Sequence, residues 1–326
     1  MTQKTIVEAI NEALMQAMEQ DETIVMLGED VGTNGGVFRA TDRLKETYGE
    51  VRVMDTPLAE SAIIGTTVGM SINGLKPIAE IQFFGFAYEA MDQIVNQAAR
   101  MRYRSKSRYN APIVIRSPYG GNVNTPELHA DSLEASYSHS PGLKIVMPSS
   151  PYDAKGLLLS AIQDPDPVLF LEPMSIYRSI REEVPDDMYE VPIGKAKIVQ
   201  EGTDVTVVSW GPPVLLINQI ITKMKDENIS IELIDLRTVA PLDIESIVAS
   251  VEKTERLLIV HEAVKTNGIG AEIAALVADR AILSLVAPIK RVTGYDSPYP
   301  AGTIEKQWMP NEQRIVAAIE ELLTYN

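Results

Sequence analysis

The stretch Val51-Arg52-Val53-Met54-Asp55, followed by TPLAESAIIGTTVGMSI at residues 56–72, contains the local pattern that decides the fold. Residues 51–55 predict a short buried strand, Thr56 and Pro57 interrupt it, and residues 58–72 have the apolar spacing of a helix. A strand followed at once by a helix is the repeating unit of α/β proteins.

Glu60 is the only charged residue of this predicted helix and lies in its first turn. The free N–H groups and the positive end of the helix dipole favour a carboxylate there, which is one sufficient explanation for it. Small residues such as Gly65 and Gly69 let the helix pack closely, so we expect the helix and Glu60 to be buried. A buried carboxylate is costly unless it is paired, protonated or used, so Glu60 is our first catalytic candidate.

Length and composition limit the class of protein. A chain of 326 residues with 45% hydrophobic and 23% charged residues predicts a folded protein of two domains. The absence of cysteine excludes disulfides, thiolate metal sites and cysteine nucleophiles. A net charge of −16 argues against nucleic acid and anionic membranes as partners. Without a signal-peptide core or an apolar run of about 20 residues, we expect a cytoplasmic protein.

Strands and helices alternate along both halves of the chain, which predicts two doubly wound α/β domains. Residues 173–196 lose this periodicity. We therefore predict a first domain at 1–185, a linker at 186–200 and a second domain at 201–326. A long helix is predicted over residues 88–103 and an opening amphipathic helix over residues 5–19.

Two loops in the first half follow predicted strands, where α/β proteins place their ligands. The loop Gly28-Glu29-Asp30-Val31-Gly32 could cradle phosphate, but its two acidic residues would repel an anion, so a turn-rich loop is the more common use of such a sequence. Glu29 is a second candidate for a buried carboxylate. Gln82-Phe83-Phe84-Gly85-Phe86 holds three of the five phenylalanines. Core packing explains most such clusters, but Gly85 predicts a turn that presents Phe86 at a surface or pocket.

A polar loop after the predicted strand at 111–116 ends in His129, one of three histidines. A lone histidine is more often structural than catalytic, and we assign that role to His139 and His261. His129 differs because its loop leaves the carboxyl edge of a strand, on the side expected for Glu60 and Phe86. Asp164 and Asp166 lie in a tight turn and are either turn formers or part of a site for a hard cation.

Several longer motifs together resemble one family. They are GEDVG (28–32), NGGVFRAT (34–41), DTPLAES (55–61), EIQFFGF (80–86), RSPYGG (116–121), TPELHADSLE (125–134), SPYDAKGLL (150–158) and DLRTVAPLD (235–243). The chain resembles the beta subunits of the thiamine diphosphate-dependent decarboxylase component of 2-oxo acid dehydrogenase complexes, and those of the pyruvate enzymes most. The resemblance implies a pyrimidine-binding domain followed by a transketolase C-terminal-like domain.

The resemblance also implies roles for residues. Glu60 matches the glutamate that hydrogen-bonds the aminopyrimidine ring nitrogen and promotes the proton relay to the thiazolium carbon. Phe86 matches the aromatic residue stacked on the pyrimidine, and His129 matches a loop histidine near the reacting carbonyl and the incoming lipoyl group. Further cofactor contacts are implied for Glu29, Leu58 and Gln82. The family's potassium site maps onto the following residues: Ile113, Ala161, Ile162, Asp164 and Asp166.

The chain contains no Gly-Asp-Gly sequence, with which enzymes of this kind hold magnesium and the diphosphate. The resemblance therefore implies an alpha subunit that supplies magnesium and half of the thiamine diphosphate site in an alpha2-beta2 heterotetramer. Contact surfaces are predicted on the helix after Glu60 and on the helix at 88–103. A second implied partner is the dihydrolipoyl acetyltransferase core, with its lipoyl and peripheral subunit-binding domains.

Three functions are compatible with the sequence. The resemblance first implies a beta subunit that decarboxylates pyruvate and reductively acetylates a lipoyl group. A second possibility keeps this chemistry on branched-chain 2-oxo acids or acetoin. A third is a non-catalytic scaffold of the same fold, against which the presence of Glu60, Phe86 and His129 argues.

Overall fold

The computed structural model describes residues 1–300 and 302–325, which form two compact units. The first unit contains residues 1–119 and 136–193, and the second contains residues 120–135 and 194–326. The boundary at Ile193 lies inside the segment predicted as a linker, 186–200. The segment 120–135, in contrast, clusters with the second unit, whereas its place in the chain led us to assign it to the first.

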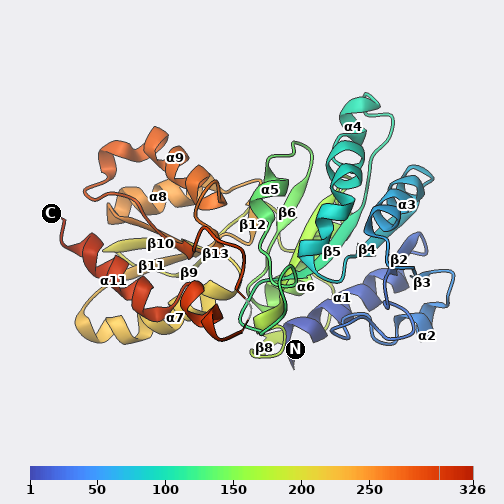
Figure 1. The fold of residues 1–326 in the computed structure, drawn as a ribbon, viewed down its shortest axis with the longest axis horizontal. Coiled ribbons are helices and arrows are strands. Elements are labelled where there is room, and N and C mark those ends of the chain that lie inside the picture. Colours follow the sequence, from blue (N-terminus) through green and yellow to red (C-terminus); the bar gives the residue numbers. More distant parts are fainter. Residues whose placement is uncertain (301, 326) are drawn as a thin grey trace. The chain divides into compact units, whose positions relative to one another are not determined.

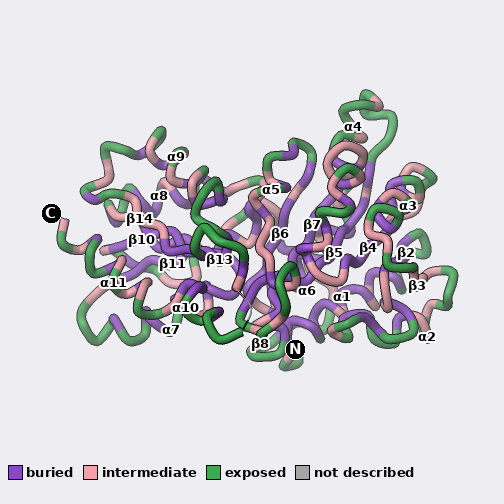
Figure 2. The backbone as a smooth tube through the Cα atoms, viewed as in Figure 1, coloured by how far each residue is buried: buried purple, intermediate pink, exposed green. Residues whose placement is uncertain are grey.

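The first unit is built around a parallel sheet with the strand order β6-β7-β5-β4-β2-β3 (Figure 1). Strands β2, β5 and β7 are buried along their whole length, as the apolar runs predicted (Figure 2). The buried strand predicted at 51–55 is wrong in part, because β3 is buried only at Val53, whereas Val51 and Asp55 are exposed. The elements are β1 Thr2–Lys4, α1 Ile6–Gln20, β2 Ile24–Gly28, α2 Leu44–Tyr48, β3 Val53–Asp55, α3 Glu60–Ile72, β4 Lys76–Glu80, η1 Phe84–Ala90, η2 Asp92–Ala98, α4 Met101–Arg104, β5 Val114–Tyr119, α5 Glu134–Ser138, β6 Lys144–Val146, α6 Pro151–Gln163, β7 Val168–Pro173, η3 Met174–Ile176 and β8 Glu182–Val184.

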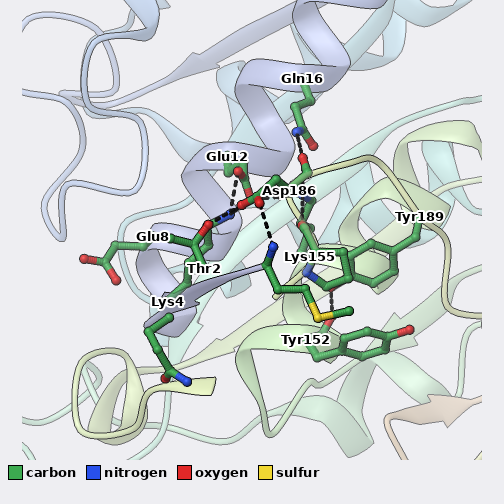
Figure 3. A network of polar contacts seen from close by, with 12 residues as sticks. Thr2, Lys4, Glu8, Glu12, Gln16, Tyr152, Lys155, Asp186 and Tyr189 are labelled. Carbon is green, nitrogen blue, oxygen red and sulfur yellow. Dashed lines mark hydrogen bonds and ion pairs between the residues drawn. The ribbon is translucent and has the colours of Figure 1, made fainter. Parts of the chain in front are cut away.

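The opening helix α1 confirms the predicted amphipathic segment. Thr5 caps it, and Glu8 completes a capping box that satisfies backbone N–H groups at both ends of the first turn. Its apolar face packs against α6. Figure 3 shows the polar contacts beside this packing: the buried ammonium of Lys155 lies 2.9 Å from Glu12 Oε2 and 2.7 Å from the carbonyl oxygen of Pro185. Lys155 thus ties α6 to α1 and to the segment after β8.

Two helical predictions need correction. The predicted helix at 88–103 is divided into the 3₁₀ segment η1, the π-helix η2 and the short helix α4. Helix α3 exists as predicted, but it is not buried all round: Ser61, Ala62, Thr66 and Gly69 are exposed, and Glu60 is half-buried. Figure 2 shows these exposed stretches along α3. The small residues therefore lie on a face that the rest of the chain leaves uncovered.

The second unit has its own sheet, with the order β14-β13-β10-β11-β9. The strands pair in parallel except β9, which is antiparallel to β11 and was not predicted. The elements are β9 Lys197–Gln200, β10 Val205–Ser209, α7 Pro212–Met224, η4 Lys225–Glu227, β11 Ile231–Asp235, β12 Thr238–Ala240, α8 Ile244–Thr254, β13 Leu257–Val264, α9 Ile269–Ala281, η5 Ile282–Ser284, β14 Lys290–Gly294, η6 Gly302–Ile304, α10 Glu305–Trp308 and α11 Glu312–Leu323.

Helices cover both faces of this second sheet, which is the doubly wound arrangement. Helices α7 and α11 share one apolar core with β10, β11, β13 and β14, while α8 and α9 pack on the other face (Figure 1). The two predicted α/β units are therefore confirmed. Among residues 1–300 and 302–325, no helix combines the length and the apolar character needed to cross a bilayer.

Candidate functional site

The predicted pyrimidine-side residues converge at one edge of the first sheet. Strands β3, β2 and β4 are neighbours and run in parallel, so their carboxyl ends lie together. Glu60 begins the helix after β3, Glu29 follows β2 directly, and Gln82 and Phe86 follow β4. Leu58 lies between β3 and Glu60 and is 70% exposed. Strand order thus brings together residues that lie far apart in the sequence.

Glu29 and Glu60 are close enough to interact electrostatically. Burial raises the pKa of Glu29, and the neighbouring carboxylates of Asp30 and Glu60 raise it further. Three carboxyl groups in one place repel one another, and a hydrogen-bond donor or a proton relieves that repulsion. The N–H groups of an aminopyrimidine fit such a site, whereas an anionic diphosphate does not.

The loop that carries Glu29 is fixed by Asp55 at the end of β3. Asp55 accepts hydrogen bonds from the backbone of Gly32 at 2.6 Å and of Thr33 at 3.0 Å, and Lys45 lies 2.9 Å away. These donors lower the pKa of Asp55 to about 2 despite its partial burial. Asp55, which opens the DTPLAES motif, therefore positions the GEDVG loop beside the helix of Glu60.

Aromatic rings support the segment after β4. The ring of Phe86 lies 5.9 Å from that of Phe83 in an edge-to-face geometry, and Phe83 makes a similar contact with Phe38 at 5.8 Å. Phe86 is half-buried, so one part of the ring is packed and another part is accessible. Gln82 donates a long hydrogen bond of 3.5 Å to Asp30.

His129 lies on the segment 120–135, which belongs to the second unit. It is half-buried, and its Nδ1 is 3.0 Å from the carbonyl oxygen of Glu127. That it faces Glu60 and Phe86 stays a prediction. His261 is structural as predicted: it is fully buried and stacked on Trp210, and burial lowers its pKa to about 3.

A buried charge network below the same sheet edge was not predicted. Arg116 on β5 pairs with Glu80 on β4 and with Glu172 on β7 at 2.7 and 2.6 Å, and Tyr177 also donates to Glu172. A signal was present, because each of these strands is an apolar run with one charge near its carboxyl end. Arg116 balances the charge of one carboxylate, and burial raises the pKa of Glu80, which favours a proton on the other. Because the three side chains satisfy one another, we assign the network to the structure rather than to chemistry.

The residues of the predicted potassium site meet at the amino ends of β5, β6 and β7. Both carboxylates already have protein cations: Lys144 Nζ lies 2.6 and 2.5 Å from the oxygens of Asp164, and Arg102 Nε lies 2.6 Å from Asp166. The carbonyl oxygens of Ile113 and Ala161 accept backbone hydrogen bonds from Val168 and Asp164. Carbonyl and carboxylate oxygens are suitable ligands for a hard cation. A potassium ion bound by the Asp164 carboxylate has to displace the Lys144 ammonium, whereas an ion bound through backbone oxygens, as the resemblance mostly implies, does not.

Divalent metals have no ready site of side-chain ligands here. Within residues 1–300 and 302–325, no three histidine, aspartate or glutamate side chains are grouped so as to hold a metal ion.

Comparisons with known proteins agree with this two-unit architecture. Residues 2–179 match the pyrimidine-binding domain of transketolase, and residues 194–315 match the transketolase C-terminal domain. A split-gene transketolase, solved as an inactive beta4 tetramer, superposes with a TM-score of 0.80 over 98% of both chains. At 21% identity, this second comparison bears on the fold alone.

Sequence relatives are much nearer. The chain is 51% identical to the pyruvate dehydrogenase E1 component subunit beta of Bacillus subtilis (strain 168), over 100% of both chains. It is 52% identical to the protein of the same name from Acholeplasma laidlawii, over 98% of this chain and 97% of the relative. The chain therefore belongs to the family of pyruvate dehydrogenase E1 beta subunits, with the pyrimidine-binding and C-terminal domains of transketolase.

Proposed function

We propose that this chain is the beta subunit of a pyruvate dehydrogenase, which decarboxylates pyruvate with thiamine diphosphate and acetylates a lipoyl group reductively. The observation that carries the proposal is the convergence of Glu60, Glu29 and Phe86 at the carboxyl ends of three neighbouring parallel strands, β3, β2 and β4. Full-length identity of 51% to a relative named for this function supports the substrate.

In this proposal Glu60 is the catalytic carboxylate. Thiamine diphosphate supplies an electron sink for the electron pair that remains when a 2-oxo acid loses CO₂. Glu60 holds a proton at the pyrimidine ring nitrogen, because a carboxylate is the acceptor that stabilises a protonated ring. Phe86 offers a ring face for stacking, and Glu29, Leu58 and Gln82 line the position of the aminopyrimidine.

His129 is proposed to act at the later step, beside the lipoyl group. An imidazole can donate a proton to a sulfur or oxygen that gains negative charge at neutral pH. His129 lies in a turn-rich loop, with its N–H bonded to the carbonyl oxygen of Pro126, and a loop position suits contact with a group that arrives on a flexible arm.

The proposed partners follow from what this chain lacks. An alpha subunit supplies the magnesium and the diphosphate half of the site, in an alpha2-beta2 heterotetramer. The uncovered small-residue face of α3 supports a contact surface there, because a helix face without charges is unfavourable in water. The dihydrolipoyl acetyltransferase core is the proposed acceptor of the acetyl group. Potassium remains a proposed structural ion. If the Asp164 carboxylate binds it, the ammonium of Lys144 has to leave that carboxylate.

Reconstitution tests these assignments. The chain is titrated with thiamine diphosphate and magnesium by calorimetry, alone and with an alpha subunit that carries the magnesium motif. We expect weak or no binding alone, and tight binding and turnover with the partner. Turnover is then compared on pyruvate, branched-chain 2-oxo acids and acetoin, with pyruvate expected to give the highest kcat/KM. Tight binding by the isolated chain would refute the shared site.

A further inference from the structure

The segment 120–135 is held by the second unit at its beginning and at its end. It leaves β5 after Tyr119 and returns to the first unit at Ser136. His129 lies between these two attachments. The conformation of the histidine-bearing segment therefore depends on contacts with residues far along the chain.

The first attachment captures three successive backbone N–H groups. The N–H of Gly121 donates to Glu262 Oε2 at 3.2 Å, that of Asn122 to the Tyr299 hydroxyl at 3.3 Å, and that of Val123 to Glu305 Oε1 at 3.2 Å. Tyr299 in turn donates its hydroxyl proton to Glu305. The three acceptors are all buried, with 5%, 6% and 3% of their surface exposed. Buried acceptors of this kind hold a backbone firmly, because an unmade bond leaves a desolvated oxygen.

Two glycines allow the backbone to come so close. A Cβ atom at Gly120, whose φ is +90°, would lie 2.6 Å from Glu262 Oε2. A Cβ atom at Gly121 would lie 2.3 Å from the Tyr299 hydroxyl. The Gly-Gly pair of the RSPYGG motif is thus explained by this attachment, since any larger residue displaces the acceptors.

The second attachment lies after His129. Ala130 packs with Tyr299, Trp308 and Met309 in a small apolar cluster, and Glu134 accepts a hydrogen bond of 3.3 Å from the Trp210 indole. Tyr299 contributes to both attachments. The two attachments therefore fix the backbone on either side of the histidine.

The first attachment contains two buried carboxyl groups, those of Glu262 and Glu305, which is more than a purely structural anchor needs. Burial, with smaller contributions from the carboxylates of Glu134 and Glu305, raises the pKa of Glu262 to about 8 despite the hydrogen bond from the Gly121 N–H. Among the described residues, Glu262 Oε1 has no hydrogen-bond partner. Retaining a buried, incompletely satisfied carboxyl group costs stability, which is typical of positions kept for function.

We propose that Glu262, Tyr299 and Glu305 are positioning residues for His129, through which the second unit sets the geometry of the reductive acetylation step. The inference rests on the proposed role of His129. A shift of about 1 Å at a reacting group costs up to about 100-fold in rate, so loosening this attachment affects the step in which His129 acts.

The test uses the reconstituted heterotetramer and the variants Tyr299→Phe and Glu305→Gln. Tyr295→Phe is the matched control, because Tyr295 is 53% exposed and its ring contact with Arg314 survives the loss of the hydroxyl. We expect both variants to slow reductive acetylation of a lipoyl domain about 10-fold or more, with a smaller effect on decarboxylation measured with an artificial electron acceptor. The control stays at the wild-type rate.

A double-mutant cycle separates positioning from general destabilisation. If Tyr299 acts through His129, Tyr299→Phe causes no further loss in a His129→Ala background. Equal losses in both backgrounds would overturn the proposal, as would unchanged hydrogen exchange of residues 121–123 in both variants. Faster exchange combined with a wild-type rate for His129→Ala would instead confirm the attachment and reject the role of His129, so the two failures are distinguishable. Glu305→Gln serves if Tyr299→Phe does not fold.

Discussion

We predict that Arg116→Met destabilises the first unit by about 3–5 kcal/mol at neutral pH. The guanidinium is fully buried and lies 2.7 Å from one oxygen of Glu80 and 2.6 and 3.0 Å from the two oxygens of Glu172. Methionine replaces much of the side-chain volume, so the loss of charge dominates over the formation of a cavity. The variant leaves two buried carboxylates without their cation, which is the costly way to break a buried ion pair.

The loss is expected to depend on pH. Burial already raises the pKa of Glu80, while Arg116 lowers it, so removing Arg116 raises the pKa of Glu80 further. A carboxyl group with a higher pKa in the folded state binds its proton preferentially there, and the stability of the folded state falls as pH rises. The loss of folding stability caused by Arg116→Met should therefore be largest above about pH 7. It should be smaller near pH 5, because that pH is closer to the ordinary glutamate pKa of about 4.3.

Hydrogen exchange of the β5 amides measures this prediction, because it reports on the first unit separately from the second. Arg100→Met is the control: Arg100 is exposed, so its replacement should change the free energy of opening by less than about 0.5 kcal/mol. Adding Glu80→Gln and Glu172→Gln to Arg116→Met should restore part of the stability, since no uncompensated charge remains. A loss under about 1 kcal/mol, or one that is equal at pH 5 and pH 8, would refute the reasoning.

Four further predictions concern the site and its surroundings. Glu60→Gln should leave assembly intact and reduce decarboxylation by about 10²- to 10⁴-fold, because an amide cannot drive the proton relay, and near-normal turnover of the purified variant argues against the assignment. His129→Ala should impair acetylation of a lipoyl domain at least as much as decarboxylation, and wild-type rates in both assays would make this residue structural. Gly69→Trp should fold, since no atom lies within 4 Å of a Cβ there, yet fail to form the heterotetramer in sedimentation, and assembly of this variant at wild-type concentrations contradicts a contact on α3. Lys144→Met should make thermal stability dependent on potassium rather than sodium, because it frees the Asp164 carboxylate for the ion, and equal melting temperatures in both salts argue against an ion held by that carboxylate.

Local pattern was sufficient for several strands and for most helices, although β9 was not predicted. The apolar spacing of residues 5–19 and 58–72 predicted α1 and α3, and the apolar run at 111–116 predicted β5, which the structure places at Val114–Tyr119. The division of residues 84–104 into η1, η2 and α4 was not predicted, because periodicity cannot distinguish a π-helix from an α-helix over so few turns.

The pattern of the sequence could not predict contacts between segments that lie far apart in the chain. A polar loop was predicted after residues 111–116, but the reason for its Gly-Gly pair at 120–121 lies in Glu262 and Tyr299, far along the chain. Assigning the segment 120–135 to the first domain followed from its neighbours in sequence, whereas the hydrogen bonds to buried side chains decide where it clusters. That Glu80, Arg116 and Glu172 form one network becomes visible only when strands β4, β5 and β7 are paired in register.

Helix α3 joins the proposed chemistry of Glu60 to the proposed assembly. No residue after Glu60 in this helix is charged, yet Ser61, Ala62, Thr66 and Gly69 are exposed. A helix whose exposed face lacks charges is typical of a contact surface, and its small residues permit a close approach of another helix. Such an approach removes water from the half-buried Glu60, and a carboxylate interacts more strongly with a protonated ring nitrogen where the dielectric constant is low. In this proposal, assembly with an alpha subunit and proton transfer at Glu60 are coupled, because the same surface of α3 is proposed to serve both.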